Sequence, residues 1–331
     1  MEEKTKIRIV KIAVYIGVLL AIILAANYAY WKVSIERSEE YRQEMSYQDY
    51  LSSSNRHLDY VFLGDSHLML GLSPKIIKNS FNFGTVGENY IITYYKLQRV
   101  LEQDKVQVDV VVLALDPQSF SSLFVGKDYQ FPHAWLSSRY VPLKDIAGFR
   151  KESLAMAYWD SRFPFMGNGQ LFMGDLFVKK YFHQEYRGWF NYSNDFSNAN
   201  KEEYAHRKYV QFYEGQEQLT DISLEYFLKT VLLAQSHNST VVLVKFPHSQ
   251  EYQDEIESHK LDTEAYYDAV FREMNKTVAK PYYFLDYYSL FFGKPNYLKD
   301  PDHVNYKGAD ILSKKFYNDM RKIQFAARES K

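Results

Sequence analysis

Cysteine is absent from the whole of the 331-residue chain. The sequence therefore excludes disulfide bonds, thiolate catalysis and Cys-ligated zinc, and it leaves the redox compartment open. An excess of basic charge is also lacking, since 40 Lys and Arg residues face 41 Asp and Glu residues. A nucleic-acid-binding protein usually carries a basic stripe that releases counterions from phosphates. We therefore expect no nucleic-acid partner.

Aromatic residues, by contrast, are abundant, with 30 Tyr and 23 Phe in a chain that is 46% apolar and 24% charged. This is the balance of a globular protein with a sizeable hydrophobic core. A core accounts for most of the aromatic residues. Tyr also suits a carbohydrate-facing surface, because its ring is apolar and its tip is polar.

One long uncharged run, residues 12–31, lies near the N-terminus. Its ~20 residues are the number that a helix needs to cross ~30 Å of hydrocarbon. The run ends with the aromatic residues Tyr28, Tyr30 and Trp31. Four basic residues precede it: Lys4, Lys6, Arg8 and Lys11. The positive-inside rule then predicts a cytoplasmic segment 1–11, a single transmembrane anchor 12–31 in the cell membrane, and an extracytoplasmic remainder. A cleaved signal peptide is the alternative, although residues 24–27 match a cleavage site poorly.

The rest of the chain divides by composition. Residues 32–58 are strongly charged and predict a solvated helical stalk. Residues 59–323 predict one α/β domain, interrupted at about 119–220 by an aromatic-rich insertion with little periodicity. Residues 324–331 form a polar tail.

Within 59–323, short apolar runs alternate with helical patterns. Strands are predicted at 60–63, 80–83, 108–115, 240–246 and 282–285, and helices at 90–102, 221–237, 262–279 and 306–323. Ser73 and Pro74 predict a further helix start. Strands that alternate with helices indicate a parallel sheet covered on both faces, and functional residues gather at the carboxyl ends of such strands.

Two polar motifs follow predicted strands: Gly64-Asp65-Ser66-His67 near the start of the domain, and Asp300-Pro301-Asp302-His303-Val304-Asn305 near its end. A serine nucleophile needs a base within hydrogen-bond reach, and that base needs an acid to orient it. Asp300 stands three residues before His303 and can turn back to its ring, whereas the adjacent Asp302 competes less well. Each motif alone also reads as a capped turn. Both motifs in this order favour catalysis by Ser66, His303 and Asp300.

These motifs resemble those of the SGNH, or GDSL, hydrolases, which have Gly-Asp-Ser after the first strand and Asp-x-x-His near the C-terminus. The resemblance implies a flavodoxin-like three-layer α/β/α sandwich, with Ser66 as nucleophile, His303 as general base and Asp300 as its orienting acid. The family's second block supplies an oxyanion-hole Gly, matched by Gly87 with Gly84 as an alternative. Its third block normally supplies an Asn, and this chain departs from it by placing Gln118 there.

The oxyanion hole is thus expected to contain the backbone N–H groups of Ser66 and Gly87 and the side-chain amide of Gln118. This amide donates like that of Asn on a longer arm. His67, His248 and Asp302 are weaker candidates for substrate contact. Asp65, His67, Asp300 and His303 are the residue types of a metal site, but their spacing does not demand one. We expect neither a metal nor a cofactor.

The anchor, the divergent third block and the insertion also resemble the proteins that esterify teichoic acids with D-alanine and the O-acetyltransferases of polysaccharides. This narrower resemblance implies D-alanyl or acetyl transfer onto a cell-envelope polymer. It implies an envelope glycopolymer or acylated carrier as substrate and a multi-spanning membrane acyltransferase as partner. A plain carbohydrate or lipid esterase is one alternative. A non-catalytic scaffold that binds such a polymer or acyltransferase is the other.

Overall fold

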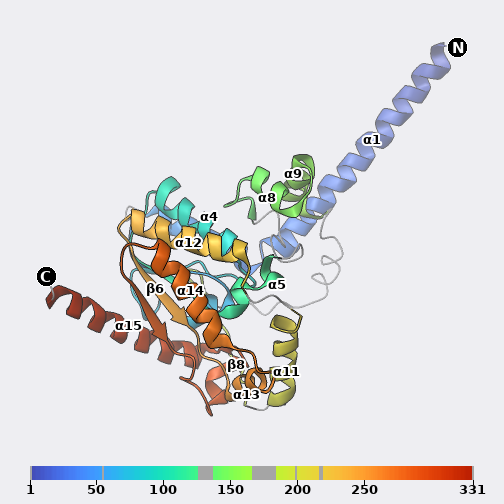
Figure 1. The fold of residues 1–331 in the computed structure, drawn as a ribbon. Coiled ribbons are helices and arrows are strands. Elements are labelled where there is room, and N and C mark those ends of the chain that lie inside the picture. The colour runs from blue at the N-terminus through green and yellow to red at the C-terminus, as the bar shows by residue number, and fades with distance from the viewer. Residues whose placement is uncertain are drawn as a thin grey trace. The chain divides into compact units, whose positions relative to one another are not determined.

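The computed structural model describes residues 2–53, 56–125, 137–165, 184–197, 200–215 and 219–329. The chain divides into two compact units (Figure 1). Unit 1 comprises residues 1–42 and 133–182, and unit 2 comprises residues 43–132 and 183–331.

Unit 2 is built on a parallel sheet in which the described strands follow the order β2-β1-β3-β6-β7. Their bounds are Ser80–Asn82 for β2, His57–Leu63 for β1, Gln107–Ala114 for β3, Thr240–Lys245 for β6 and Tyr282–Asp286 for β7. In chain order this is the 2-1-3-4-5 arrangement of flavodoxin-like folds. The register pairs Val61 with Val111 and Val111 with Val241, so three central strands share one hydrophobic layer.

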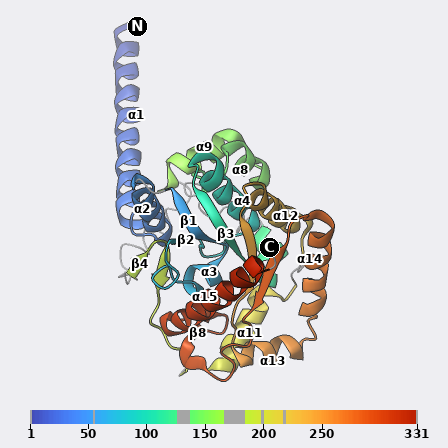
Figure 2. The same ribbon diagram turned by 90° about the vertical axis from the view of Figure 1, so that its left-hand side faces the viewer.

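Alternate residues of each strand enter two separate hydrophobic cores, as the period of two requires. Val111 and Leu113 lie in one core, and Val110 and Val112 lie in the other. Helices α4 (Tyr90–Gln98), α12 (Asp221–Ser236) and α14 (Thr263–Thr277) cover the first face, and α3 (Ser66–Gly71) and α15 (Tyr306–Glu329) cover the second. Figures 1 and 2 show helices on both sides of the sheet. The predicted three-layer α/β/α sandwich is therefore confirmed.

The predicted strands and long helices lie within a few residues of the observed ones, with two local differences: one predicted helix is a turn, and one observed helix was not predicted. Residues 74–76 form a turn rather than a helix, because Ile76 and Ile77 both bond back to the carbonyl of Ser73 and the pattern stops there. Ser73 and Pro74 therefore begin a single capped turn and not a helix. Helix α13 (Gln250–Ser258) is an addition that the sequence analysis did not predict.

Helix α2 (Glu39–Ser52) differs from the solvated stalk expected over residues 32–58. Tyr47 is fully buried, and its ring meets Phe81 and Phe83 with centroids 5.2 and 4.6 Å apart. The buried amide of Gln43 donates to the carbonyls of Asn82, Gly84 and Gly188. The second half of the expected stalk is thus part of the core of unit 2.

The predicted insertion 119–220 contains several short elements between β3 and α12. Those in unit 2 are the 3-10 turn η3 (Pro117–Phe120), α5 (Ser122–Val125), the hairpin β4–β5 (Gln184–Tyr186 and Trp189–Asn191) and α11 (Lys201–Phe212). Those in unit 1 are α8 (Leu143–Arg150) and α9 (Leu154–Arg162). Of the insertion, residues 126–136, 166–183, 198–199 and 216–218 lie outside the described part of the chain.

Unit 1 also contains the long N-terminal helix α1 (Glu2–Tyr30), which continues as the π-helical turn η1 (Trp31–Ile35). Residues 3–35 are long and apolar enough to cross a membrane, and the most apolar stretch of this helix buries nothing against the protein. A signal sequence near the N-terminus would pass the same test. The end of α1 contacts the end of α9, where Asn27 donates to the carbonyl of Arg162 at 3.2 Å.

The packing of α2 predicts that Tyr47→Ala lowers the free energy of unfolding of the full-length protein by about 3–5 kcal/mol, the usual cost of deleting a buried aromatic ring. Tyr47→Phe keeps the ring and loses the hydrogen bond to Asp104, so it is expected to cost about 1 kcal/mol. Urea unfolding in detergent, followed by circular dichroism, measures both. A loss below about 0.5 kcal/mol for Tyr47→Ala would instead indicate an exposed stalk.

Candidate active site

The first predicted motif lies at the carboxyl end of β1, where α3 begins at Ser66. Asp65 caps this helix by accepting from the backbone N–H of His67 at 2.9 Å. Gly64 connects strand and helix with a φ of +148°, and a Cβ there would lie 3.2 Å from the Cβ of Ala114. The tight turn therefore favours glycine and presents Ser66 at the edge of the sheet.

The second motif forms a small antiparallel hairpin of β8 (Leu298–Asp300) and β9 (His303–Val304), in which Asp300 pairs with His303. Asn305 then caps α15 by accepting from the N–H of Gly308, and its amide donates to the carbonyl of Leu298. These bonds attach the hairpin to the start of α15. They hold Asp300 and His303 in a fixed relation to each other.

The structure brings Ser66, His303 and Asp300 into one hydrogen-bonded line, although 237 positions separate Ser66 from His303. The Ser66 Oγ lies 2.7 Å from His303 Nε2, and His303 Nδ1 lies 2.9 Å from Asp300 Oδ1. Asp300 Oδ1 also accepts from the backbone N–H of His303 at 3.0 Å. Ser66 is partly accessible, so the residue at the end of this line is not fully enclosed.

Asp302 also approaches His303, with its Oδ1 3.1 Å from Nδ1, but it is fully buried and pairs with Lys208 as well, at 2.9 Å. Burial by itself would raise the pKa of Asp302. The charges of His303 and Lys208 outweigh burial and hold that pKa well below its usual range. Lys208 comes from α11 in the insertion, and no signal in the sequence connected it with the second motif.

A buried cluster of charges surrounds His67, whose ring stacks on that of His303 at 4.7 Å. Burial would lower the pKa of His67, but Asp65 at 3.1 Å and Asp116 at 3.4 Å raise it to about 10. Burial and repulsion from Asp65 in turn raise the pKa of Asp116 to about 7, despite the attraction of His67. Asp116 stands two residues after the end of β3, so its place at the carboxyl edge was a signal that sequence reasoning missed.

The expected oxyanion donors differ in whether they already contact another group of the protein. The N–H of Gly84 already donates to Asn82 Oδ1 at 2.9 Å, which leaves Gly87 as the candidate from this block. Within the described part of the chain, the backbone N–H groups of Ser66 and Gly87 have no protein acceptor. Gln118 is buried, and its amide nitrogen lies 3.4 Å from both ring nitrogens of His67. Its role as an oxyanion donor stays a prediction.

His67, His248 and Asp302, the weaker candidates for substrate contact, are all at most 3% exposed. His248 packs among aromatic rings, 4.7 Å from that of Tyr288, and neither of its ring nitrogens has a partner in the described residues. Burial, with the charge of His67, holds the pKa of His248 well below its usual range. The three side chains therefore form a closed layer rather than an exposed surface, and within it His67 and Asp302 contact His303.

Two groups of donors in this layer lie close enough together to hold a metal ion: His67, Asp302 and His303, and Asp65, His67 and Asp116. A protonated His67 already balances the carboxylates of the second group, and Lys208 balances Asp302. Ion pairs with His67 and Lys208 thus place positive charge beside these carboxylates, whereas Asp116 Oδ2 and both carboxylate oxygens of Asp302 accept no hydrogen bond from the described residues.

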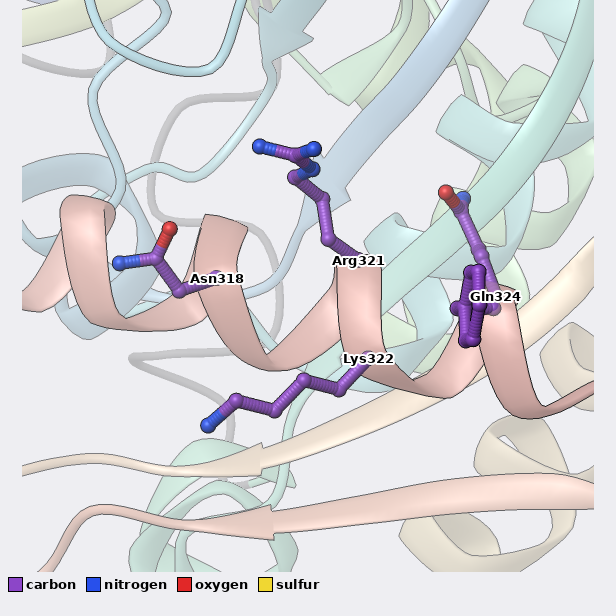
Figure 3. Close-up of a pocket in the computed structure, with 5 residues that line it drawn as sticks. Asn318, Arg321, Lys322 and Gln324 are labelled. Carbon is purple, nitrogen blue, oxygen red and sulfur yellow. The ribbon is translucent and has the colours of Figure 1, made fainter.

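A hollow along α15 is separate from this layer (Figure 3). Arg321 and Gln324 project from one side of the helix there, and Lys322 projects from the other. The amide of Gln324 lies 3.5 Å from the hydroxyl of Tyr60, the middle residue of β1, whereas Ser66 lies beyond the end of that strand. The hollow thus lies toward the opposite edge of the sheet from Ser66.

No family model matches the chain, and no curated protein matches it. Similar solved structures include a proposed acylhydrolase from Bacteroides fragilis, with 12% identity, a TM-score of 0.39 and coverage of 84% of this chain and 95% of that one. A GDSL-like lipase from Bacteroides thetaiotaomicron has 12% identity, a TM-score of 0.37 and coverage of 85% and 98%. A proposed platelet activating factor from Streptococcus pneumonia has 11% identity, a TM-score of 0.40 and coverage of 92% and 98%. The fold is therefore assigned from the strand order and register of the chain itself.

The raised pKa of His67 predicts a pH-dependent contribution to stability. Because the folded state binds this proton more tightly than the unfolded chain, the contribution is fully present below pH 6.5 and is lost as the pH rises through about 10. We expect His67→Gln to be less stable than wild type at pH 6.5 and the difference to shrink toward pH 10. Thermal unfolding across this range measures it, with the exposed His206→Gln as control. A difference that is independent of pH would contradict the charged state of His67.

Proposed function

We propose that this protein is a membrane-anchored, serine-dependent acyl-transferring enzyme of the SGNH type, with Ser66 as nucleophile. The observation that supports the proposal is the hydrogen-bonded line from Ser66 through His303 to Asp300, with steps of 2.7 and 2.9 Å. A hydroxyl, an imidazole and a carboxylate in this order are the parts that nucleophilic catalysis needs. A purely structural loop would not require a partly open serine at the end of the line.

The reaction would proceed in two halves. Ser66 Oγ attacks an ester carbonyl and gives its proton to His303 Nε2, while Asp300 holds the other side of the ring and stabilises the imidazolium. The bond from the acyl carbon to the leaving alcohol then breaks, and His303 returns the proton to that alcohol. In the second half a hydroxyl compound or water gives its proton to His303 and attacks the acyl carbon. The bond from that carbon to Ser66 Oγ then breaks, and His303 returns the proton to Ser66.

The tetrahedral intermediate of each half carries a negative oxygen. The backbone N–H groups of Ser66, at the first turn of α3, and of Gly87 are available to donate to it. Donors already aimed at the developing charge are worth much more in a partly closed site than in water. Gln118 is the proposed third donor. Its amide would have to turn from His67 toward the acyl oxygen.

The proposed setting is the outer face of the cell membrane, with α1 as a single-pass anchor. The basic residues before the apolar run favour a cytoplasmic N-terminus. Because the native chain has no Cys, a Lys331→Cys variant reports orientation through a membrane-impermeant maleimide. We expect labelling on intact cells. Labelling only after lysis would reverse the proposed topology.

We further propose that the acyl group, D-alanyl or acetyl, is transferred to a hydroxyl of an envelope glycopolymer. An enzyme anchored at the membrane meets such polymers, and acylated carriers or a multi-spanning acyltransferase, at high effective concentration. Aromatic residues are frequent around the insertion, and a sugar held against aromatic faces would place its hydroxyl near the acyl-serine and exclude water. Hydrolysis uses the same site when water reaches the acyl-enzyme first.

The assignment of the triad predicts that Ser66→Ala abolishes turnover and labelling by a fluorophosphonate probe. Asp300→Asn is expected to lower the rate by up to ~10⁴, because the ring of His303 loses its orienting acceptor. Asp302→Asn should lower it far less, since Asp302 faces Lys208. Rates with an activated acyl ester, for variants with unchanged unfolding curves, provide the test. Equal losses at both aspartates would assign the orienting role to the pair.

The fate of the acyl group distinguishes transfer from hydrolysis. The full-length enzyme is given a labelled acyl ester with and without candidate glycopolymers, and both polymer-bound label and free acid are measured. Transfer predicts label on the polymer and less free acid when polymer is added. Release of free acid at the same rate in every case would indicate a plain carbohydrate or lipid esterase. Polymer binding without turnover by the wild type, unchanged in Ser66→Ala, would indicate a scaffold.

A further inference from the structure

Helix α9 exposes a run of apolar side chains that a water-facing helix would not favour. Its sequence begins Leu-Ala-Met-Ala-Tyr-Trp, and Leu154, Met156 and Trp159 are 57, 58 and 54% exposed. Tyr158 is also exposed, and within the helix only Ala157 is buried. Such a group of large apolar side chains usually marks a surface that binds something apolar.

The neighbouring helix α8 makes this surface continuous. Its own apolar residues Ile146 and Ala147 are buried, and α8 packs against α9. Between the two helices lies an open hollow whose lining is almost wholly apolar: Leu143, Leu154, Ala155, Tyr158 and Trp159, with Lys144 among them. The α8–α9 surface, defined by these residues and Met156, is therefore broader than a single helix.

Contacts within unit 1 place α9 at a definite level along α1. The side chain of Asn27 donates to the carbonyl of Arg162 at 3.2 Å and accepts from the N–H of Phe165 at 3.4 Å, and the rings of Tyr30 and Phe165 meet edge to face. These contacts join the C-terminal end of α9 to the last turns of α1. Asn27 is four residues, or about 6 Å of helix rise, before the end of the apolar run at Trp31.

We propose that the α8–α9 surface lies in the headgroup–acyl boundary of the same membrane that α1 spans, as a second, interfacial attachment of unit 1. The proposal rests on the membrane span proposed for α1. With nine residues, α9 is about 14 Å long, so no part of it lies farther than about 14 Å from its contact with Asn27, near the end of the apolar run. Tyr and Trp are the side chains that prefer this depth, because they have an apolar body and a polar tip.

The charges around the surface suit lipid headgroups. Part of the acidic charge near α9 is balanced within the protein, since Arg150 pairs with Asp160 at 2.8 Å and with Glu152 at 3.3 Å. Lys144 and Lys151 are exposed beside the apolar residues. Basic side chains at the rim of an apolar surface are the arrangement of interfacial helices, where they meet phosphate groups.

The test places a polarity-sensitive fluorophore at single cysteines in the full-length chain, which has none of its own. Leu20→Cys reports on α1, Met156→Cys on α9, and Leu232→Cys, an exposed apolar position on α12, is the matched control. Each labelled protein is reconstituted into vesicles of phosphatidylcholine and phosphatidylglycerol. The vesicles contain lipids with a nitroxide quencher either near the headgroup or near the chain end. Thermal unfolding confirms that each variant is folded.

We expect the Met156 label to shift its emission to the blue and to be quenched by the shallow nitroxide more than by the deep one. The Leu20 label should be quenched by the deep nitroxide, and the Leu232 label should behave as in water. A Met156 label that matches Leu232 while Leu20 is embedded would overturn the interfacial attachment and leave the α8–α9 surface to a protein partner. A Leu20 label in water would overturn the membrane span and this proposal together. Neither result bears on the Ser66 chemistry.

Discussion

The burial of a positive imidazole among carboxylates is the constraint on which the candidate active site depends. His67 is almost inaccessible to water, yet Asp65 and Asp116 lie within 3.4 Å of its ring and favour its charged form. Removing one member of such a buried group leaves an uncompensated charge, at a cost of roughly 3–5 kcal/mol. The ring of His303 stacks on His67, so the position of the proposed general base depends on this balance.

The parallel sheet explains why this group assembles at one edge. Strands β1, β3 and β6 point the same way, so the residues that follow them, including Ser66, Asp116 and His248, meet although they are far apart in the sequence. The β8–β9 hairpin is then attached to that edge, where Ser249 donates to the carbonyl of Pro301 at 2.7 Å. Asp300 and His303 therefore approach Ser66 from a rigid support rather than from a free loop.

Lys208 and α2 illustrate interactions that local patterns do not contain. Charged residues at the start of α2 suggested a solvated helix, while Tyr47 and Gln43 bind the sheet edge through contacts with residues more than thirty positions away. Lys208 neutralises Asp302 from an insertion that has no periodic pattern of its own. Helical propensity and charge describe a segment. They do not determine which distant segment of the chain packs against it.

The sequence by itself determined the alternation of strands and helices, because apolar runs of four to eight residues and capped helical periods depend on nearby residues. It also determined the order of the two motifs, and with them Ser66, Asp300 and His303 as candidates. Only the tertiary structure decided that Asp300 hydrogen-bonds His303 while Asp302 also lies 3.1 Å from the same ring nitrogen, that the N–H of Gly84 already donates to Asn82, and that Gln118 contacts His67. The reason is physical: which hydrogen bonds form, and which charges are neutralised, depends on atoms that distant segments bring within about 3 Å of one another.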